Sequence, residues 1–421
     1  MLKRYPWTEA TRLACHMEVL RRKPMLQRVF REFHEVLLHL DRRYFGDTPG
    51  ARVELGSGVA PARDVIPDVW VSDVVWAPHL DLVADAHTLG RSRNAVLTES
   101  LARREACTRC GFCLYGCGYQ AIYNAALELE DLRRHPALTY VPGQWAEHLD
   151  VGPKGPQLTT LDRRTGERHA WTAPVILLAC GTLATTRLVL GALGWLDRPV
   201  RLLSQPSMGF ALWLPGCLAR PYPNRFFGLA QLSFVATSRA EKERPIMAGN
   251  LFLACAVPLW ELTSRLPVPP VWGYRLLRDL VPSLLLGNAL FSAAFSDHTV
   301  TLGQDGKLRV RGRYRPELFR CLRQVVRVLR RGFRRCGAWL LPGSVRLVTP
   351  GADVHYAGTL PHRRFPGPAE TDVMGAVAGL EGVYVVDASV LPSLPAKAHT
   401  FTVMANAHRI AMAVYQRYHR A

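Results

Sequence analysis

Residues 382–411 read GVYVVDASVLPSLPAKAHTFTVMANAHRIA and carry more information on the architecture than any other segment of the chain. The apolar run VYVV predicts a buried strand that ends at Asp387. A proline-broken loop follows, then His399, then small and apolar residues that predict a helix, with Thr400 able to cap its first turn. A helix N-terminus close to the end of a buried strand offers free N–H groups to a negatively charged ligand. The segment therefore predicts an α/β fold with a ligand site at this point.

A second informative segment is CTRCGFCLYGC, residues 107–117. Its four cysteines have the C-x2-C-x2-C-x3-C spacing of a bacterial ferredoxin, although Gly118 stands where proline usually follows. An iron–sulfur cluster fits the spacing, but no second group of cysteines occurs downstream. A zinc site and a metal-free loop are the alternatives, and the metal-free loop is favoured. The cysteines of this segment are Cys107, Cys110, Cys113 and Cys117.

Composition indicates a globular protein, since the 421 residues are 48% apolar and 21% charged. The formal net charge of +19 is carried mainly by arginine. Residues 320–337 predict a helix with arginines on one face, and the absence of interleaved aromatic residues argues against a nucleic-acid partner. Contact with a membrane surface stays open. No signal peptide is visible, and the apolar run 280–295 is shorter than the about 20 residues that a spanning helix needs, so we expect a cytoplasmic protein.

Residues 1–90 predict one βαβ unit with a glycine turn. The string VELGSGVAPARDVIPDVWVSDVV, with the acidic residues that follow it, resembles the start of the class I S-adenosylmethionine (SAM)-dependent methyltransferases. The further strands of that family do not follow, so a remnant without methyltransferase chemistry is the alternative. The resemblance implies a SAM or nucleotide site formed by Glu54, Gly56, Gly58, Asp73 and Asp85.

From residue 91 to residue 421 the chain resembles the glucose-methanol-choline (GMC) oxidoreductases. Three parts carry the resemblance: the cysteine segment with the helix after it, APVILLACGTLATTRLVLGALG at 173–194, and the pair ADVHYAGT at 352–359 and AKAHTFT at 396–402. The family implies an FAD cofactor. The residues that the resemblance places at FAD are Gly111, Cys113, Gly116, Asn124, Ala179, Gly181, Thr182, Asp387, Ala388 and Thr400. Asp387 could instead cap a turn.

The same resemblance implies that His355 and His399 face the substrate carbinol. Imidazole suits proton transfer there, because its pKa near 6.5 lets it accept a hydroxyl proton at neutral pH. One histidine would be the general base and the other would hydrogen-bond the substrate oxygen, and the sequence leaves open which is which. The expected reaction oxidises a CH–OH group of an alcohol or sugar-like substrate, with oxygen, a quinone or a protein carrier as electron acceptor.

One feature of the family is missing, because no GxGxxG motif in the family's context precedes Arg91. The glycines of residues 55–58 have the methyltransferase context instead. A non-catalytic fused remnant is therefore a third hypothesis beside oxidoreductase and methyltransferase. We predict four regions: a partial Rossmann-like unit at 1–90, a cysteine loop and FAD-binding segment at 91–200, an α+β substrate region at 201–345, and a flavin-facing segment at 346–421.

Overall fold

The computed structural model describes residues 87–92, 94, 96, 97, 99, 100, 104–221, 225–237, 245–257, 259–264 and 266–419. The predicted methyltransferase-like site, Glu54, Gly56, Gly58, Asp73 and Asp85, lies outside these residues. The chain divides into two compact units, each assembled from three segments. The first unit contains Met1–Leu127, Ser207–Leu290 and Phe319–Leu347, and the second contains Glu128–Pro206, Phe291–Leu318 and Val348–Ala421. The four regions predicted from the sequence stay a prediction.

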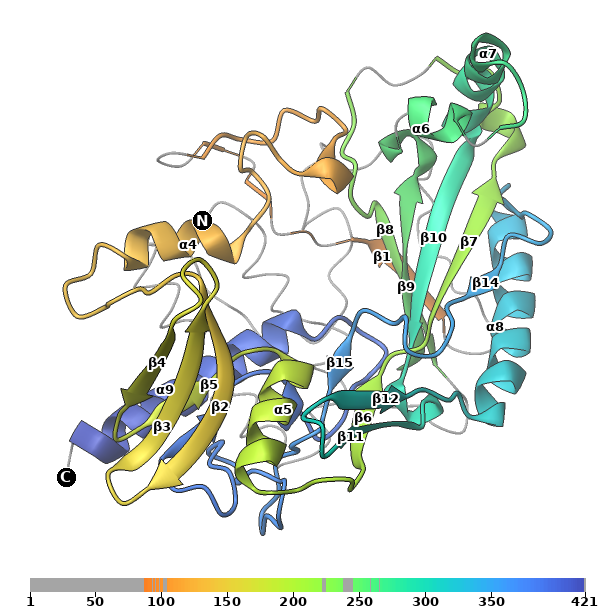
Figure 1. Ribbon diagram of the computed structural model, residues 1–421. Coiled ribbons are helices and arrows are strands. Elements are labelled where there is room, and N and C mark those ends of the chain that lie inside the picture. The colour runs from red at the N-terminus through yellow and green to blue at the C-terminus, as the bar shows by residue number, and fades with distance from the viewer. Residues whose placement is uncertain are drawn as a thin grey trace, which may run out of the picture. The chain divides into compact units, whose positions relative to one another are not determined.

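The first unit is built on one sheet (Figure 1). Strand β7 shows the alternation that one buried face requires, with Met208, Phe210 and Leu212 buried and their neighbours partly exposed. Helix α8 packs on the sheet, since the ring of Phe333 lies 6.1 Å from the rings of both Phe210 and Phe234. The strand order is β1 (His87–Arg91), β8 (Leu232–Thr237), β9 (Pro245–Leu253), β10 (Leu284–Phe291), β7 (Ser207–Trp213) and β13 (Trp339–Leu340), with β14 (Arg346–Leu347) also pairing with β7.

Helix α8 (Pro316–Arg335) confirms the helix predicted at 320–337. Its apolar face is buried through Val325 and Leu329, whereas Arg323, Arg327 and Arg330 are exposed. The helices that begin in the first unit are α4 (Ala125–Leu132), α6 (Leu259–Thr263) and α7 (Pro270–Leu280), with short 3-10 turns at Cys113–Tyr115, Pro215–Cys217, Ala254–Ala256 and Val281–Ser283. None of the helices in the described residues is both long enough and apolar enough to cross a membrane.

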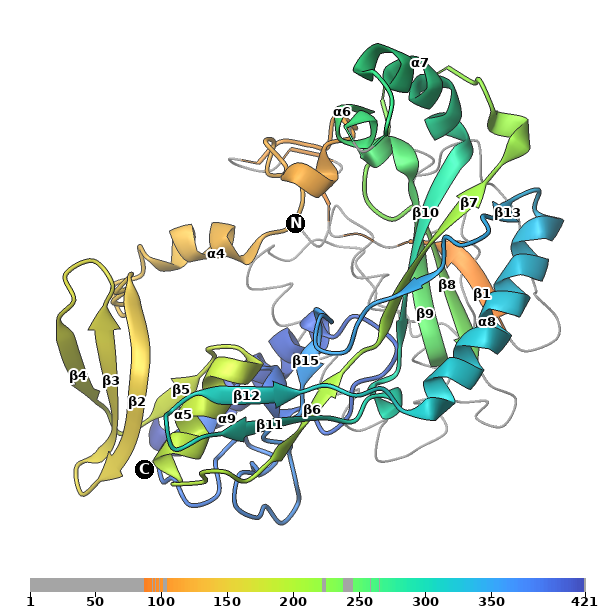
Figure 2. The ribbon, with the colours of Figure 1, turned by 45° about the vertical axis from the view of Figure 1, so that its right-hand side comes forward.

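The second unit contains three small sheets (Figure 2). One is antiparallel, with β2 (Gln144–Gly152), β3 (Gly155–Asp162) and β4 (Arg168–Thr172). The second has the order β12 (Leu308–Arg311), β11 (His298–Leu302), β6 (Val200–Ser204) and β15 (Tyr356–Ala357). The third is the parallel pair β5 (Ile176–Leu178) and β16 (Val383–Val385).

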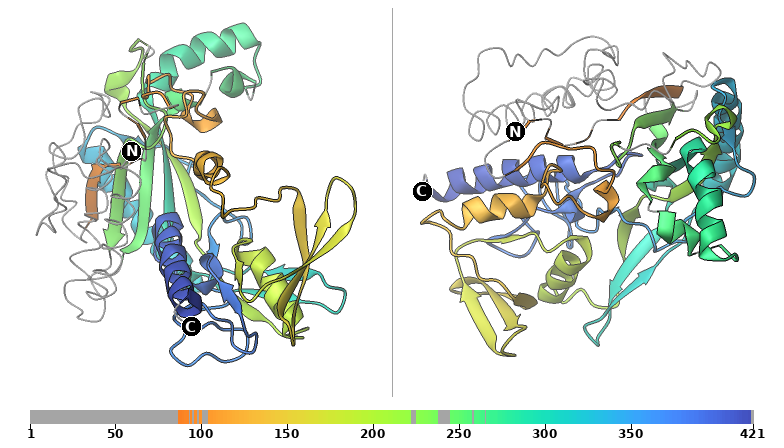
Figure 3. Two further views of the ribbon diagram at one scale, coloured as in Figure 1. Left: turned by 90° about the vertical axis from the view of Figure 1, so that its left-hand side faces the viewer. Right: turned by 90° about the horizontal axis from the view of Figure 1, so that it is seen from above.

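The parallel pair has the local order that the sequence predicts. Strand β5 leads into α5 (Thr182–Ala192), and β16 leads into a 3-10 turn at Ala388–Val390. A second 3-10 turn is formed by Ala293–Phe295. Apolar residues of β5, α5 and β16 share one core, in which Leu178, Val189 and Val385 are buried. The final helix, α9 (Thr400–His419), is continuous in Figure 3 and closes a second cluster on Tyr384 and Val386 through Ile410.

Candidate active site

The two predicted histidines of the second unit lie beside each other. The ring centroids of His355 and His399 are 5.0 Å apart, and the ring planes are nearly perpendicular, at 89°. His355 directly precedes β15, and His399 directly precedes α9. Both residues are partly buried. The structure therefore brings together two residues that are far apart in the sequence.

Gln205, at the end of β6, contacts the segments that carry both histidines. Its Oε1 lies 2.6 Å from Nδ1 of His355. Its Nε2 donates to the backbone oxygens of Pro395 and of Lys397, the latter at 2.8 Å. Gln205 is 1% exposed. The sequence does not indicate a role for Gln205, because the string SQPS that contains it matches no motif. The pairing of β6 with β15 is what places Gln205 beside His355.

Both rings are neutral at physiological pH. Burial lowers the pKa of His355, and the nearby carboxylate of Asp353 opposes this effect. Burial, with the positive charge that His355 would carry, lowers the pKa of His399 to about 4. A neutral imidazole carries one N–H and one lone pair, so each ring can accept a proton at one nitrogen and donate from the other.

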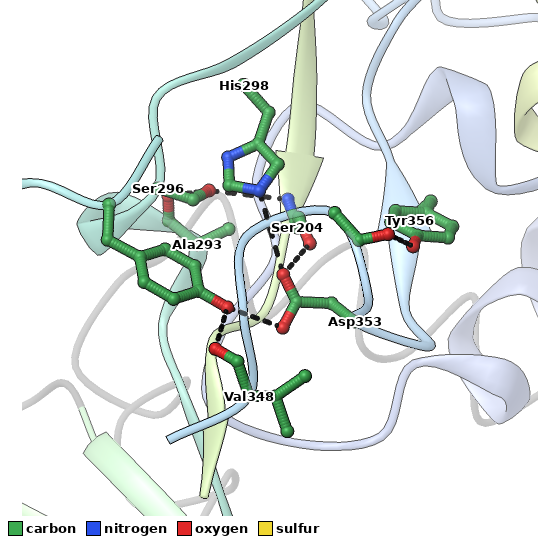
Figure 4. A network of polar contacts seen from close by, with 9 residues as sticks. Ser204, Ala293, Ser296, His298, Val348, Asp353 and Tyr356 are labelled. Carbon is green, nitrogen blue, oxygen red and sulfur yellow. Dashed lines mark hydrogen bonds and ion pairs between the residues drawn. The ribbon is translucent and has the colours of Figure 1, made fainter. Parts of the chain in front are cut away.

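A buried polar cluster supports this site from the side of Asp353 (Figure 4). The Asp353 carboxylate accepts hydrogen bonds from the hydroxyl of Ser204 at 2.7 Å and from that of Tyr314 at 2.9 Å. Ser204 precedes Gln205, and Asp353 lies two positions before His355, so the cluster ties the ends of β6 and β15 together. Burial and the adjacent carboxylate raise the pKa of Tyr314, which remains a donor.

His298, the first residue of β11, is the remaining member of this cluster. It is fully buried, and its Nε2 lies 3.7 Å from Oδ2 of Asp353. Because burial lowers the pKa of His298, the ring is neutral and the contact is not an ion pair. His298 and Asp353 therefore form part of the support for the candidate site. Asp353 lies in the segment ADVHYAGT, but nothing in the local sequence pattern indicates its hydrogen-bond partners.

Apart from Thr400, which begins α9, the predicted cofactor residues of the second unit lie just after the carboxyl ends of β5 and β16. Ala179 and Gly181 are exposed there, and Thr182 begins α5. Gly181 has a φ of +85°, and no heavy atom lies within 4 Å of the position that a Cβ would occupy. Ligands of open parallel sheets bind outside the carboxyl ends of strands, which is where these small residues leave room.

Asp387 links the ends of the two strands. Its Oδ2 accepts from the backbone N–H of Gly181 at 3.0 Å and from the hydroxyl of Thr185 at 2.5 Å. Its Oδ1 accepts from the backbone N–H of Ser389 at 2.9 Å and from the Ser389 hydroxyl. The carboxylate thus caps the 3-10 turn that begins at Ala388, in line with the alternative that the sequence left open. Contact of Asp387 with a cofactor stays a prediction, as does that of Ala388 and of Thr400.

A third histidine, His362, is structural. Its Nδ1 lies 3.0 Å from Oγ1 of Thr371, whose own hydroxyl donates to the backbone oxygen of Leu360 at 3.0 Å. Nδ1 must therefore donate to Thr371, which leaves Nε2 to accept from Nδ2 of Asn406 at 3.2 Å. Burial, with a smaller effect of Arg409, lowers the pKa of His362 to about 4. The neutral ring thus joins α9 to the loop before β16.

The cysteine segment belongs to the first unit. Cys107, Cys113 and Cys117 pack against an apolar cluster around Phe227. Cys113 Sγ accepts from the backbone N–H of Gly228 at 3.3 Å, and burial raises the pKa of both Cys107 and Cys113. In the part of the chain that the structure describes, no group of three or more His, Cys, Asp or Glu side chains is placed to hold a metal ion.

Two further predicted residues of the first unit have local structural roles. Gly111 has a φ of +82°, and a Cβ there would lie 2.5 Å from the ring of Phe226. Asn124 caps α4, because its Oδ1 accepts from the backbone N–H of Ala126 at 2.9 Å. Gly116, with a φ of +100°, has open space where a Cβ would be. Contact of these residues with FAD stays a prediction.

Residues 348–407 match a protein-family model described as GMC oxidoreductase. The matched segment contains His355, Asp387 and His399. Over these residues the chain is similar to the GMC oxidoreductases, and the predicted resemblance is confirmed for this segment. A comparison with curated proteins finds no match.

Solved structures that are similar to this chain include pyridoxine 4-oxidase from Mesorbium loti and two variants of the formate oxidase of Aspergillus oryzae RIB40. Identity to the first is 20%, with a TM-score of 0.47, and the match covers 68% of this chain and 60% of that one. The formate oxidase variants are 16% and 15% identical, with TM-scores of 0.47 and 0.44, and 69% and 68% of this chain and 62% of each variant are covered. The match thus spans about three fifths of the length of these structures.

Proposed function

We propose that the chain is an FAD-dependent oxidoreductase that oxidises a CH–OH group of a small alcohol or sugar-like substrate. The observation that carries this proposal is the perpendicular pair of His355 and His399, 5.0 Å apart, inside the segment that matches the GMC family. Two neutral, partly buried imidazoles suit a hydroxyl group, which needs one partner to take its proton and another to hold its oxygen.

The histidines divide the proton chemistry of the reaction between them. FAD, when bound, accepts the hydride that leaves the carbinol carbon. One imidazole takes the hydroxyl proton, and the other donates a hydrogen bond to the oxygen as negative charge develops on it. The low pKa values of both rings keep them neutral for these roles.

The carboxyl ends of β5 and β16 fit part of FAD. Ala179, Cys180 and Gly181 are small and exposed, and the open space above Gly181 lets a dinucleotide approach the backbone. Thr182 starts helix α5 and Ala388 starts a 3-10 turn, and these two elements flank this space. No GxGxxG motif precedes Arg91, so the residues that would hold the ADP half have no assignment in this sequence. We therefore expect weak retention of FAD during purification.

The electron acceptor is oxygen, a quinone or a protein carrier, and the reaction takes place in the cytoplasm. The oxidase names of the similar structures describe those proteins, and oxygen is one of three acceptors that a reduced flavin can use. A comparison of reoxidation rates in air-saturated buffer and with a soluble quinone distinguishes them. Rapid reoxidation by oxygen alone would assign oxidase activity to this chain.

The experiment that tests the proposal is a titration of the purified protein with FAD, followed by anaerobic addition of a panel of alcohols and sugars. We expect quenching of flavin fluorescence on binding, and bleaching of the visible flavin bands by at least one CH–OH compound. The His355→Ala variant should bind FAD normally but bleach much more slowly. A protein that ignores FAD at high concentration would contradict the proposal.

A further inference from the structure

We propose that Gln205 is a positioning residue that holds His355 in the Nδ1–H tautomer, so that Nε2 of His355 keeps a free lone pair. This proposal rests on the proposed function, because the lone pair matters for the proton transfer of that reaction.

The orientation of the Gln205 amide is fixed by two backbone carbonyls. Its nitrogen lies within hydrogen-bond distance of the oxygens of Pro395 and Lys397. Carbonyl oxygens only accept, so the NH2 group must face them. The amide oxygen then faces His355, 2.6 Å from Nδ1. A flipped amide would set its oxygen against two carbonyl oxygens and lose both hydrogen bonds.

The amide orientation determines the tautomer of His355. Oε1 of Gln205 can only accept, so Nδ1 of His355 must carry the hydrogen. A neutral imidazole has one N–H, and His355 is neutral because burial lowers its pKa. Nε2 therefore has a free lone pair. It is the nitrogen of His355 that can take a proton from a substrate.

The surroundings of His399 favour the opposite tautomer. Its Nδ1 is buried and has no hydrogen-bond partner among the described residues. A buried N–H without an acceptor is rare and costs about 1–3 kcal/mol, so the hydrogen is placed on Nε2. His399 then presents an N–H and His355 presents a lone pair. One perpendicular ring pair thus offers a substrate hydroxyl both an acceptor and a donor.

Gln205 also joins the backbones that carry the two rings. Its backbone N–H donates to the oxygen of His355 at 3.4 Å, while its side chain holds the loop at Pro395 and Lys397 that leads into His399. The residue is 1% exposed, so solvent does not replace these bonds. Without Gln205, neither the tautomer of His355 nor the position of His399 would be fixed. A residue that only packs against the rings would affect neither tautomer.

The first test is histidine nitrogen NMR on the wild-type protein without substrate. Uniform ¹⁵N labelling of histidine distinguishes Nδ1–H from Nε2–H rings by chemical shift, and the His355→Gln and His399→Gln variants assign the two signals. We expect His355 as the Nδ1–H tautomer and His399 as the Nε2–H tautomer. An Nε2–H tautomer for His355 would overturn the proposal. This measurement requires no activity, so it stands or fails separately from the proposed function.

The second test is the Gln205→Glu variant. Glutamate can still accept from Nδ1 of His355, but its negative charge favours the imidazolium form and raises the pKa of His355. The titratable groups that act on His355 among the described residues are Asp353 and His399, and neither is changed. We expect the acidic limb of the kcat/KM pH profile to move up by about one unit or more. An unmoved limb in a folded variant would contradict the assignment.

Two further variants are controls for this test. Gln205→Met removes the hydrogen bond that fixes the tautomer of His355 but adds no charge. The value of kcat should therefore fall roughly ten- to a hundredfold, with no upward shift of the acidic limb. Gln304→Glu adds the same charge at an exposed glutamine of the second unit and should leave the profile unchanged. If Gln304→Glu moved the limb equally, the effect of Gln205→Glu would be one of net charge, and the proposal would fail.

Discussion

Gly181, at the start of α5, donates its backbone N–H to the carboxylate of Asp387 at 3.0 Å, although 206 positions separate the two residues. The same oxygen accepts from Thr185, so one carboxylate holds the first turn of α5 against the end of β16. The carboxyl ends of both parallel strands are thereby fixed by a single side chain. This is the part of the second unit where small exposed residues leave room for a dinucleotide.

We predict that Asp387→Ala lowers the free energy of unfolding by about 3 kcal/mol, because four donors lose a buried charged acceptor. Urea denaturation followed by circular dichroism measures this loss. Ser389→Ala, which removes only the hydroxyl contact, should cost about 1 kcal/mol. If Asp387→Ala left stability unchanged but abolished FAD binding, the carboxylate would serve the cofactor and not the fold.

Substitution of the paired histidines should affect turnover and not cofactor binding. We expect His355→Ala to lower kcat at least a hundredfold, the usual contribution of a general base. His399→Ala removes a hydrogen-bond donor to the developing oxyanion and should also lower kcat by about two orders of magnitude. Stopped-flow reduction of the flavin measures both. The exposed His148 provides the matched control, and full activity in both single variants would refute the assignment.

Stability should fall between about pH 6.5 and pH 4 because of His362. Its pKa is about 4 in the folded protein, against about 6.5 in an unfolded chain. The unfolded state therefore binds more protons in this range, and the folded state loses stability as the pH decreases. The expected loss is on the order of 2 kcal/mol. Thermal unfolding at a series of pH values measures it.

A His362→Gln variant is the control for that pH dependence. Glutamine retains a donor and an acceptor but does not titrate in this range. The variant should therefore show a shallower decrease in melting temperature between pH 6.5 and pH 4 than the wild type. His399, with a pKa of about 4, contributes to the remaining slope, as do His298 and His355, whose pKa values burial also lowers. An identical slope in both proteins would show that His362 is not the titrating group.

The cysteine segment should be sensitive to a side chain at Gly111. An alanine there is strained by the φ of +82°, and its Cβ would overlap the ring of Phe226. We expect Gly111→Ala to lower stability by about 2–3 kcal/mol. Gly166→Ala has a similar φ of +79° but open space, and should cost only about 1 kcal/mol. Equal losses in the two variants, measured by urea denaturation, would mean that the contact with Phe226 is unimportant.

The local elements of the second unit were predictable from the sequence, because their patterns are local. The apolar run before Asp387 and the small residues after Leu178 indicate strands that lead into turns, and α9 follows from its composition. The proximity of His355 and His399 followed from the family resemblance. Gln205 could not be predicted, since its role depends on the pairing of β6 with β15. The same holds for the buried contact between Asp353 and Tyr314.

The parallel pairing of β5 with β16 has a consequence for synthesis in the cell. Leu178 pairs with Val385, so more than two hundred residues must leave the ribosome after β5 before its partner strand exists. A contact of such sequence separation makes folding slow and leaves apolar strands exposed in the nascent chain. We expect this unit to depend on chaperones during translation. A ribosome-bound chain halted before residue 383 should be cut rapidly by protease at β5, and a chain released at its end should not.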